Sequence, residues 1–98
     1  MFSLESASPA DFTPLLNGEF GLPGHSPDGP LRLIAVDLLG LGHPGRKEPF
    51  VLRFQGPAGL RLPQSIYALQ HAGLGTLEVF LVQNGADAAG SYFEAVFN

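Results

Sequence analysis

Glycine and proline recur so often along this chain that no regular element can be long. Thirteen glycines and nine prolines are distributed over 98 residues, and short apolar segments lie between them. Clusters of these two residues mark turns and interrupt helices. The connection between two parallel strands needs about a dozen residues or more, and the intervals here are too short for it. The sequence therefore predicts short antiparallel strands joined by turns.

Alternation of apolar and polar side chains locates the strands. Between Phe50 and Gln55, three apolar residues on one face alternate with Val51, Arg53 and Gln55 on the other, which is typical of a half-buried strand. The final segment is apolar on both faces, so we expect it to lie centrally in the sheet or to be covered on one side by a partner. We predict a loop over 84–90, and strands over 19–22, 31–39, 50–55, 65–70, 76–82 and 91–97.

The first segment has a helical pattern instead. Pro9 follows a serine that is suited to cap a helix, and Phe12, Leu15 and Leu16 recur at helical spacing. Pro14 prevents a long helix because its ring and its missing N–H disrupt the helix interior. We expect one or two helical turns over 9–17, with these three apolar side chains plugging an open end of a sheet or barrel.

These elements predict one mainly β domain over residues 1–98. A chain of this length forms a single domain with a single core. Closing the sheet, or packing two sheets together, removes exposed strand edges. The expected fold is a small antiparallel barrel or sandwich of five to six strands with one short N-terminal helix.

The charges exclude several classes of partner. The net charge is −4, and the five basic residues are scattered, so the chain lacks the basic stripe that binds nucleic acid or the polybasic segment that binds a membrane surface. There is no apolar run long enough to span a membrane and no secretory signal. We therefore expect a cytoplasmic protein, and delivery to a surface within an assembly stays open. The absence of cysteine excludes disulfides and thiolate metal sites.

No motif predicts a cofactor, a metal site or catalysis. Gly40, Gly42 and Gly45 form a G-x-G-x-x-G pattern, but a proline and a strand follow where a dinucleotide site needs a helix. The histidines at 25, 43 and 71 are not spaced as metal ligands. We expect a hairpin loop at the glycine pattern, no cofactor, no metal and no enzyme activity.

One polar cluster is a candidate site. Tyr67, His71 and Glu94 would form a proton-transfer group or a binding cluster if the fold brought them together. The alternative, which we favour, is that His71 bonds a backbone carbonyl at the end of its strand.

The apolar content points to a partner surface. Hydrophobic residues make up 45% of the chain and charged residues 14%, against about 25% charged in a typical domain. Some apolar side chains are expected to meet a protein partner or a second copy. The candidate residues are Phe80, Tyr92, Phe93 and Phe97. The leading hypothesis is a non-enzymatic interaction or structural module, and the alternative is a small β-barrel that binds an apolar ligand.

Four stretches in the second half carry a family resemblance, and DFTPLLNGEF (Asp11 to Phe20) adds a fifth. They are PFVLRFQGP (Pro49 to Pro57), LPQSIYALQHAGLG (Leu62 to Gly75), VFLVQNG (Val79 to Gly85) and YFEAVFN (Tyr92 to Asn98). In this order they resemble a family of small bacterial proteins known as a domain of unknown function. The resemblance implies an association with phage-tail-collar-type proteins, and hence an accessory role in a phage-tail-like or fibre assembly. It implies no catalytic residue.

Overall fold

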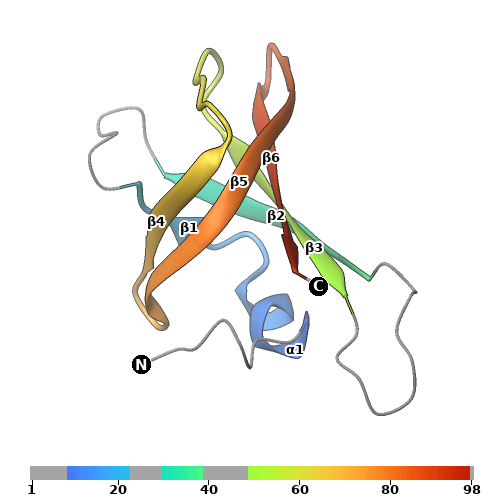
Figure 1. Ribbon diagram of the computed structural model, residues 1–98, viewed down its shortest axis with the longest axis vertical. Coiled ribbons are helices and arrows are strands. Elements are labelled where there is room, and N and C mark those ends of the chain that lie inside the picture. The colour runs from blue at the N-terminus through green and yellow to red at the C-terminus, as the bar shows by residue number, and fades with distance from the viewer. Residues whose placement is uncertain (1–8, 23–29, 39–48, 98) are drawn as a thin grey trace.

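Six antiparallel strands curl into a nearly closed barrel with a short helix at one end (Figure 1). The computed structural model describes residues 9–22, 30–38 and 49–97. The glycine pattern at 40–45 and the histidines at 25 and 43 lie outside the described residues. The elements are α1 (Pro9–Phe12), η2 (Thr13–Leu15, a 3-10 turn), β1 (Glu19–Phe20), β2 (Leu31–Leu38), β3 (Phe50–Gly56), β4 (Ser65–His71), β5 (Gly75–Asp87) and β6 (Gly90–Phe97).

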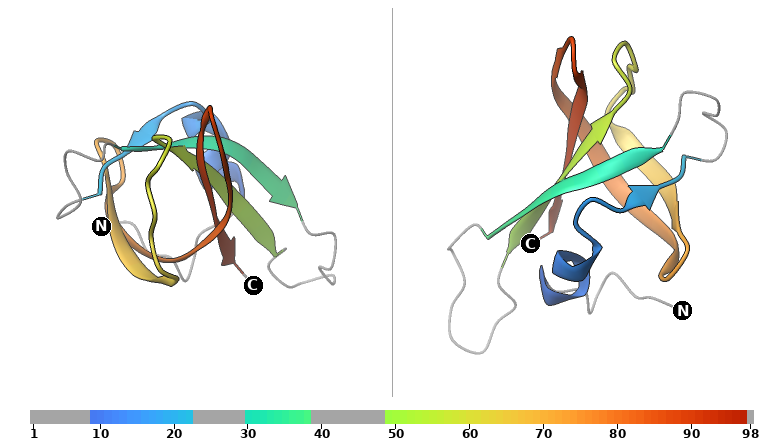
Figure 2. Two further views of the ribbon diagram at one scale, coloured as in Figure 1. Left: turned by 90° about the horizontal axis from the view of Figure 1, so that it is seen from above. Right: turned by 180° about the vertical axis from the view of Figure 1, so that it is seen from behind.

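The strand order is β1-β2-β3-β6-β5-β4, and one bridge joins the two outer strands. The amide of Gly21 donates to the carbonyl of Gln70 at 2.8 Å, and the amide of Gln70 donates to the carbonyl of Gly21 at 2.9 Å. We call this pair of hydrogen bonds the barrel seam. Seen from above, the strands run around a common axis (Figure 2, left). The predicted antiparallel barrel is confirmed, and β6 is central, between β3 and β5, as one of the two expectations held.

Alternate side chains of the strands fill the barrel. Phe54 is 1% exposed and its ring meets that of Phe20 edge-on, with centroids 5.4 Å apart. Leu33, Leu69 and Leu81 are likewise buried in the interior. The predicted inward face of β3 is confirmed, since Phe50, Leu52 and Phe54 belong to this core. The other face is not uniformly exposed, because Val51 is only 4% exposed.

The N-terminal segment closes one end of the barrel, and α1 lies below that end in Figure 1. Phe12 is fully buried, with its ring centroid 5.9 Å from that of Phe50 and 5.8 Å from that of Phe97. Leu15 also packs against the core, but Leu16 is 38% exposed, so its expected role as a plug is wrong. The reason is that the helix tightens into the 3-10 turn at Pro14, and the chain is already extended at Leu16.

The connection between β5 and β6 is much shorter than expected. β5 continues to Asp87, so the predicted loop over 84–90 is wrong. The pairing register shifts between Gln83 and Gly85, which makes Asn84 the extra residue of a β-bulge and lets the ladder continue. The Asp87 carboxylate then accepts hydrogen bonds from the amides of Ala89 (2.8 Å) and Gly90 (3.1 Å), which holds a tight turn.

Within the described residues, the helical segments are too short to cross a membrane.

Candidate functional site

The four aromatic residues expected at a partner surface divide between the inside and the outside of the barrel. Phe93 is 1% exposed and belongs to the core, and Phe97 stacks on Phe50 at a centroid distance of 4.7 Å. Tyr92 lies on the outer face, where its hydroxyl donates to the Asp87 carboxylate at 3.0 Å. Phe80 is also on the outer face and is 52% exposed. Among these four, Phe80 offers the largest apolar surface to a partner.

A second exposed apolar residue lies directly opposite Phe80. Ile66 in β4 pairs with Phe80 in the β4–β5 register, and it is 65% exposed. Residues directly opposite on neighbouring antiparallel strands have Cβ atoms about 5 Å apart, so the two side chains form one surface. We call Ile66 and Phe80 the outer apolar pair.

Sequence reasoning missed Ile66, although a signal existed. The segment SIYALQH places Ile66 on the face opposite to Leu69, and the short turn after His71 aligns Ile66 with Phe80 across the hairpin. Val96 on β6 is also exposed, at 50%, but the paired register of β5 with β6 begins at Val82 and Glu94, so Val96 is not a paired neighbour of Phe80.

The predicted cluster of Tyr67, His71 and Glu94 is not brought together. Tyr67 packs against the barrel core, and its hydroxyl donates to the carbonyl of Pro63 at 2.6 Å. The His71 ring lies against Phe20 with a centroid distance of 4.8 Å. Glu94 is on the outer face, in register with Arg53 and Val82.

His71 has a backbone role, as the alternative interpretation held, but with amides instead of a carbonyl. Its Nδ1 accepts hydrogen bonds from the amides of Gly73 (3.0 Å) and Leu74 (3.2 Å). Nδ1 acts as an acceptor only when it carries no proton, so the Nε2–H tautomer fits this turn. The imidazole therefore holds the β4–β5 turn.

A row of charges crosses the outer face over β2, β3 and β6. Arg53 donates from Nε to Asp37 at 2.6 Å and from Nη1 to Glu94 at 2.8 Å. Asn84 at the bulge donates to the same Glu94 oxygen at 3.1 Å. The hydrogen bond to Asp37, together with the charges of both carboxylates, raises the pKa of Arg53 above its usual value. These groups satisfy one another, so the row joins three strands and is not a set of free reactive groups.

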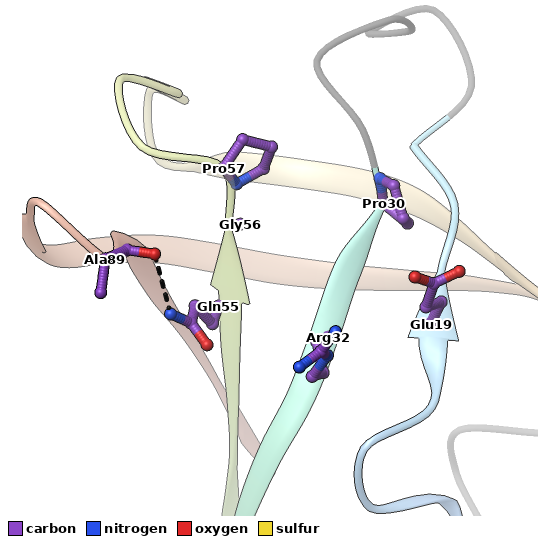
Figure 3. A pocket seen from close by; sticks show the side chains of 7 residues that line it. All are labelled: Glu19, Pro30, Arg32, Gln55, Gly56, Pro57 and Ala89. Atoms are coloured by element: carbon purple, nitrogen blue, oxygen red, sulfur yellow. Dashed lines mark hydrogen bonds between the residues drawn. The ribbon is translucent and has the colours of Figure 1, made fainter.

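A small pocket of about 280 Å³ lies at the rim of the barrel (Figure 3). Glu19 and Arg32 are opposite each other in the β1–β2 register, so one wall carries both an acid and a base. Gln55 donates to the carbonyl of Ala89 at 3.1 Å, which Figure 3 shows as a dashed line. The other lining residues are Pro30, Gly56 and Pro57. This polar pocket opens at the surface, whereas the barrel interior is occupied by apolar side chains.

No group of three or more histidine, aspartate or glutamate side chains is arranged to hold a metal ion within the three described ranges.

Comparison with known proteins identifies the family. No curated protein and no solved structure matches the chain. The family model described as a domain of unknown function (DUF6916) matches residues 7–97, which is nearly the whole chain. A family of unknown function is what the sequence resemblance implied. This barrel, with its terminal plug and its outer apolar pair, belongs to the DUF6916 family.

Proposed function

We propose that this chain is a non-enzymatic protein-interaction module that docks through the outer face of the β4–β5 hairpin. The observation that carries the proposal is the outer apolar pair, with Ile66 65% exposed and Phe80 52% exposed side by side. For a place in a phage-tail-like or fibre assembly, the support is the association with phage-tail-collar-type proteins that the sequence resemblance implies.

Physical chemistry favours a protein partner for this face. Complete burial of a Phe or Ile side chain contributes about 1.5–3 kcal/mol relative to leaving it exposed. Aromatic side chains are enriched at protein interfaces, and charged residues are depleted from the centre of such interfaces. Phe80 provides the aromatic ring, and the strand that holds Ile66 has no acidic or basic residue from Ser65 to Gln70.

The alternative function, binding of an apolar ligand in the barrel, has less support. Such a ligand needs a largely apolar cavity with a few polar groups. Phe54, Leu69 and Leu81 fill the barrel interior, and Phe12 covers one end. The rim pocket has charged groups in its wall, which suits small polar molecules better than apolar ones.

Site-specific photo-cross-linking tests the proposed docking face. Benzoylphenylalanine is incorporated at position 80 in the protein produced in the cells that normally make it. We expect cross-links to discrete protein species after irradiation. Leu38 is the matched control position, because it is 55% exposed and apolar but lies on β2, away from the outer apolar pair.

The two positions decide the outcome together. Cross-links at position 80 that are absent at position 38 support a docking face on the β4–β5 hairpin. An absence of cross-links at position 80, or equal cross-linking at both positions, would falsify the proposal.

A further inference from the structure

The rim pocket lies where the ladder between β2 and β3 ends. Arg32 and Gln55 are the last pair of that ladder at this end. In the same register Pro30 would come opposite Pro57, and neither proline has an N–H to donate. Beyond the last pair the two strands therefore separate, and both prolines line the pocket (Figure 3).

Three polar side chains from neighbouring strands form one row along the pocket. Arg32 on β2 is opposite Glu19 on β1 and opposite Gln55 on β3. The adjacent residues Phe20 and Phe54 belong to the core, so this row lies on the outer face of the barrel. Figure 3 shows Arg32 between the other two residues of the row.

The two charges of this row do not pair with each other. Opposite charges directly across two antiparallel strands stabilise the sheet when their side chains are in contact. Glu19 and Arg32 form no such contact, since both ion pairs within the described ranges are those of Arg53. Both side chains are also exposed. A carboxylate and a guanidinium therefore line the pocket without an oppositely charged partner from the described part of the chain.

The rest of the pocket is held in a fixed shape. The Gln55 amide donates to the carbonyl of Ala89 at 3.1 Å. A Cβ atom at Gly56 would come 2.9 Å from the side chains of Leu31 and Leu60, so this residue rests directly on the packed core. The rings of the two prolines restrict their backbone as well. A wall that is formed before binding loses little conformational freedom when a ligand enters.

We propose that the rim pocket binds a free α-amino acid, whose carboxylate pairs with Arg32 and whose ammonium pairs with Glu19. The planar guanidinium presents two parallel N–H groups that match a carboxylate, and an ionised carboxylate accepts hydrogen bonds from an ammonium. An α-amino acid carries both of its charges on one carbon atom, which suits two protein charges on directly opposed residues. The volume of about 280 Å³ is just below the range of about 300–1,000 Å³ for pockets that take drug-sized ligands, which favours a small molecule.

The same two charges disfavour other classes of ligand. A simple anion such as phosphate would meet Glu19, and a simple cation would meet Arg32. An apolar molecule would remove water from both charges without replacing its hydrogen bonds. A neutral sugar would bond to both groups and leave both charges uncompensated.

This inference goes beyond the proposed function and does not rest on it. The pocket is formed by β1, β2, β3 and the β5–β6 turn, whereas the outer apolar pair is on β4 and β5. A chain that cross-links from position 80 without binding an amino acid keeps its docking face and loses the pocket. The reverse result keeps the pocket and loses the docking face.

Titration of the complete, unsubstituted chain with L-alanine, followed by nuclear magnetic resonance, tests the pocket. We expect saturable shifts of the backbone amides of Arg32 and Gly56 and of the side-chain amide of Gln55. The expected dissociation constant is millimolar, because ion pairs at an exposed site are weak. Acetate and methylamine each carry one of the two charges, and we expect either molecule alone to bind about tenfold more weakly or worse. Glucose is the neutral probe, and we expect no saturable shifts with it.

Two substitutions separate the paired charges from the rest of the pocket. Arg32→Gln and Glu19→Gln each remove one charge and keep a polar side chain, and we expect each to weaken alanine binding about tenfold or more. Arg61→Gln and Glu78→Gln are the matched controls, because both residues are exposed and neither lines the pocket, so binding is expected to stay unchanged. Circular dichroism checks that all four variants fold.

Alanine binding that needs both charges supports the amino-acid site. Four results would overturn it: no saturable shifts with alanine, acetate or glucose binding as tightly as alanine, shifts that map outside the pocket, or unchanged binding in both Arg32→Gln and Glu19→Gln.

Discussion

At the scale of single residues, Phe12 closes the lower end of the barrel from an element too short to be stable alone. α1 has only four residues, and isolated helices below about 12 residues are marginal in water. The fully buried ring of Phe12 against Phe50 and Phe97 is therefore what holds the helical segment in place.

Replacing Phe12 with alanine is expected to lower the free energy of unfolding by about 3 kcal/mol, because the cavity it leaves is added to the lost burial. Urea denaturation followed by circular dichroism measures the change. Leu16→Ala is the control, since Leu16 is 38% exposed in the same segment, and its expected cost is below about 1 kcal/mol. An equal decrease in the free energy of unfolding in the two variants would contradict the role of Phe12 in closing this end of the barrel.

The pKa of Tyr92 depends on a hydrogen bond at the turn between β5 and β6. Its hydroxyl donates to the Asp87 carboxylate, and this hydrogen bond, with partial burial and the negative charge of Asp87, raises the pKa of Tyr92 above 10.0. A raised pKa means that the folded state favours the neutral phenol. The contribution of this bond is fully present below pH 10 and is lost as the pH rises through the higher pKa of the folded protein.

Asp87→Asn is expected to lower the pKa of Tyr92, because the neutral amide removes the charge and weakens the acceptor. The ultraviolet absorbance of the phenolate measures the titration. Tyr67→Phe supplies the background in which Tyr92 is the single tyrosine. An unchanged titration in Asp87→Asn would show that the carboxylate does not hold the hydroxyl.

At the scale of elements, Arg53 links three strands. From β3 it reaches Asp37 on β2 and Glu94 on β6, and Asn84 joins the row from the bulge of β5. Exposed ion pairs are individually worth about 0–1 kcal/mol, but here one guanidinium separates two carboxylates. Its removal leaves both acids on one face without their shared cation.

Arg53→Gln is expected to lower the free energy of unfolding by about 1 kcal/mol at low salt, with a smaller difference at high salt because ions screen the pairs. Denaturant unfolding at two ionic strengths measures both effects. Arg61→Gln is the control, since Arg61 is exposed and forms no ion pair with the described residues. A difference that does not depend on salt would show that the stem of Arg53 matters more than its charge.

At the scale of the whole molecule, the alternation of apolar and polar residues and the spacing of turns predicted the strands and the barrel. Contacts between residues far apart in the sequence could not be predicted. Alternation placed Phe50 and Leu52 in the core, because the period of two is a local property of a strand. It did not predict that Val51, on the other face, is also buried, with 4% of it exposed. The bulge at Asn84 was not predictable, since an Asn-Gly pair is equally typical of a hairpin turn.

The candidate site was likewise predictable only in part. Phe80 was identified from its own strand, but its exposed partner Ile66 depends on the pairing register of two strands. Glu94 was grouped with His71 as a polar group that could approach it in space, and the fold places Glu94 outside the barrel with Arg53. A sequence shows which side chains alternate, and it does not show which strands become neighbours.

The barrel seam also has a consequence for how the molecule forms and opens. Gly21 and Gln70 are far apart along the chain, and closing such a long loop costs conformational entropy, which two hydrogen bonds between the described residues offset at this point. The hairpins of β4–β5 and β5–β6 need only short loops, so we expect them to form early and β1 to meet β4 late. On warming, we expect the same junction to part first, so that the curved sheet unrolls from there while its central strands stay paired.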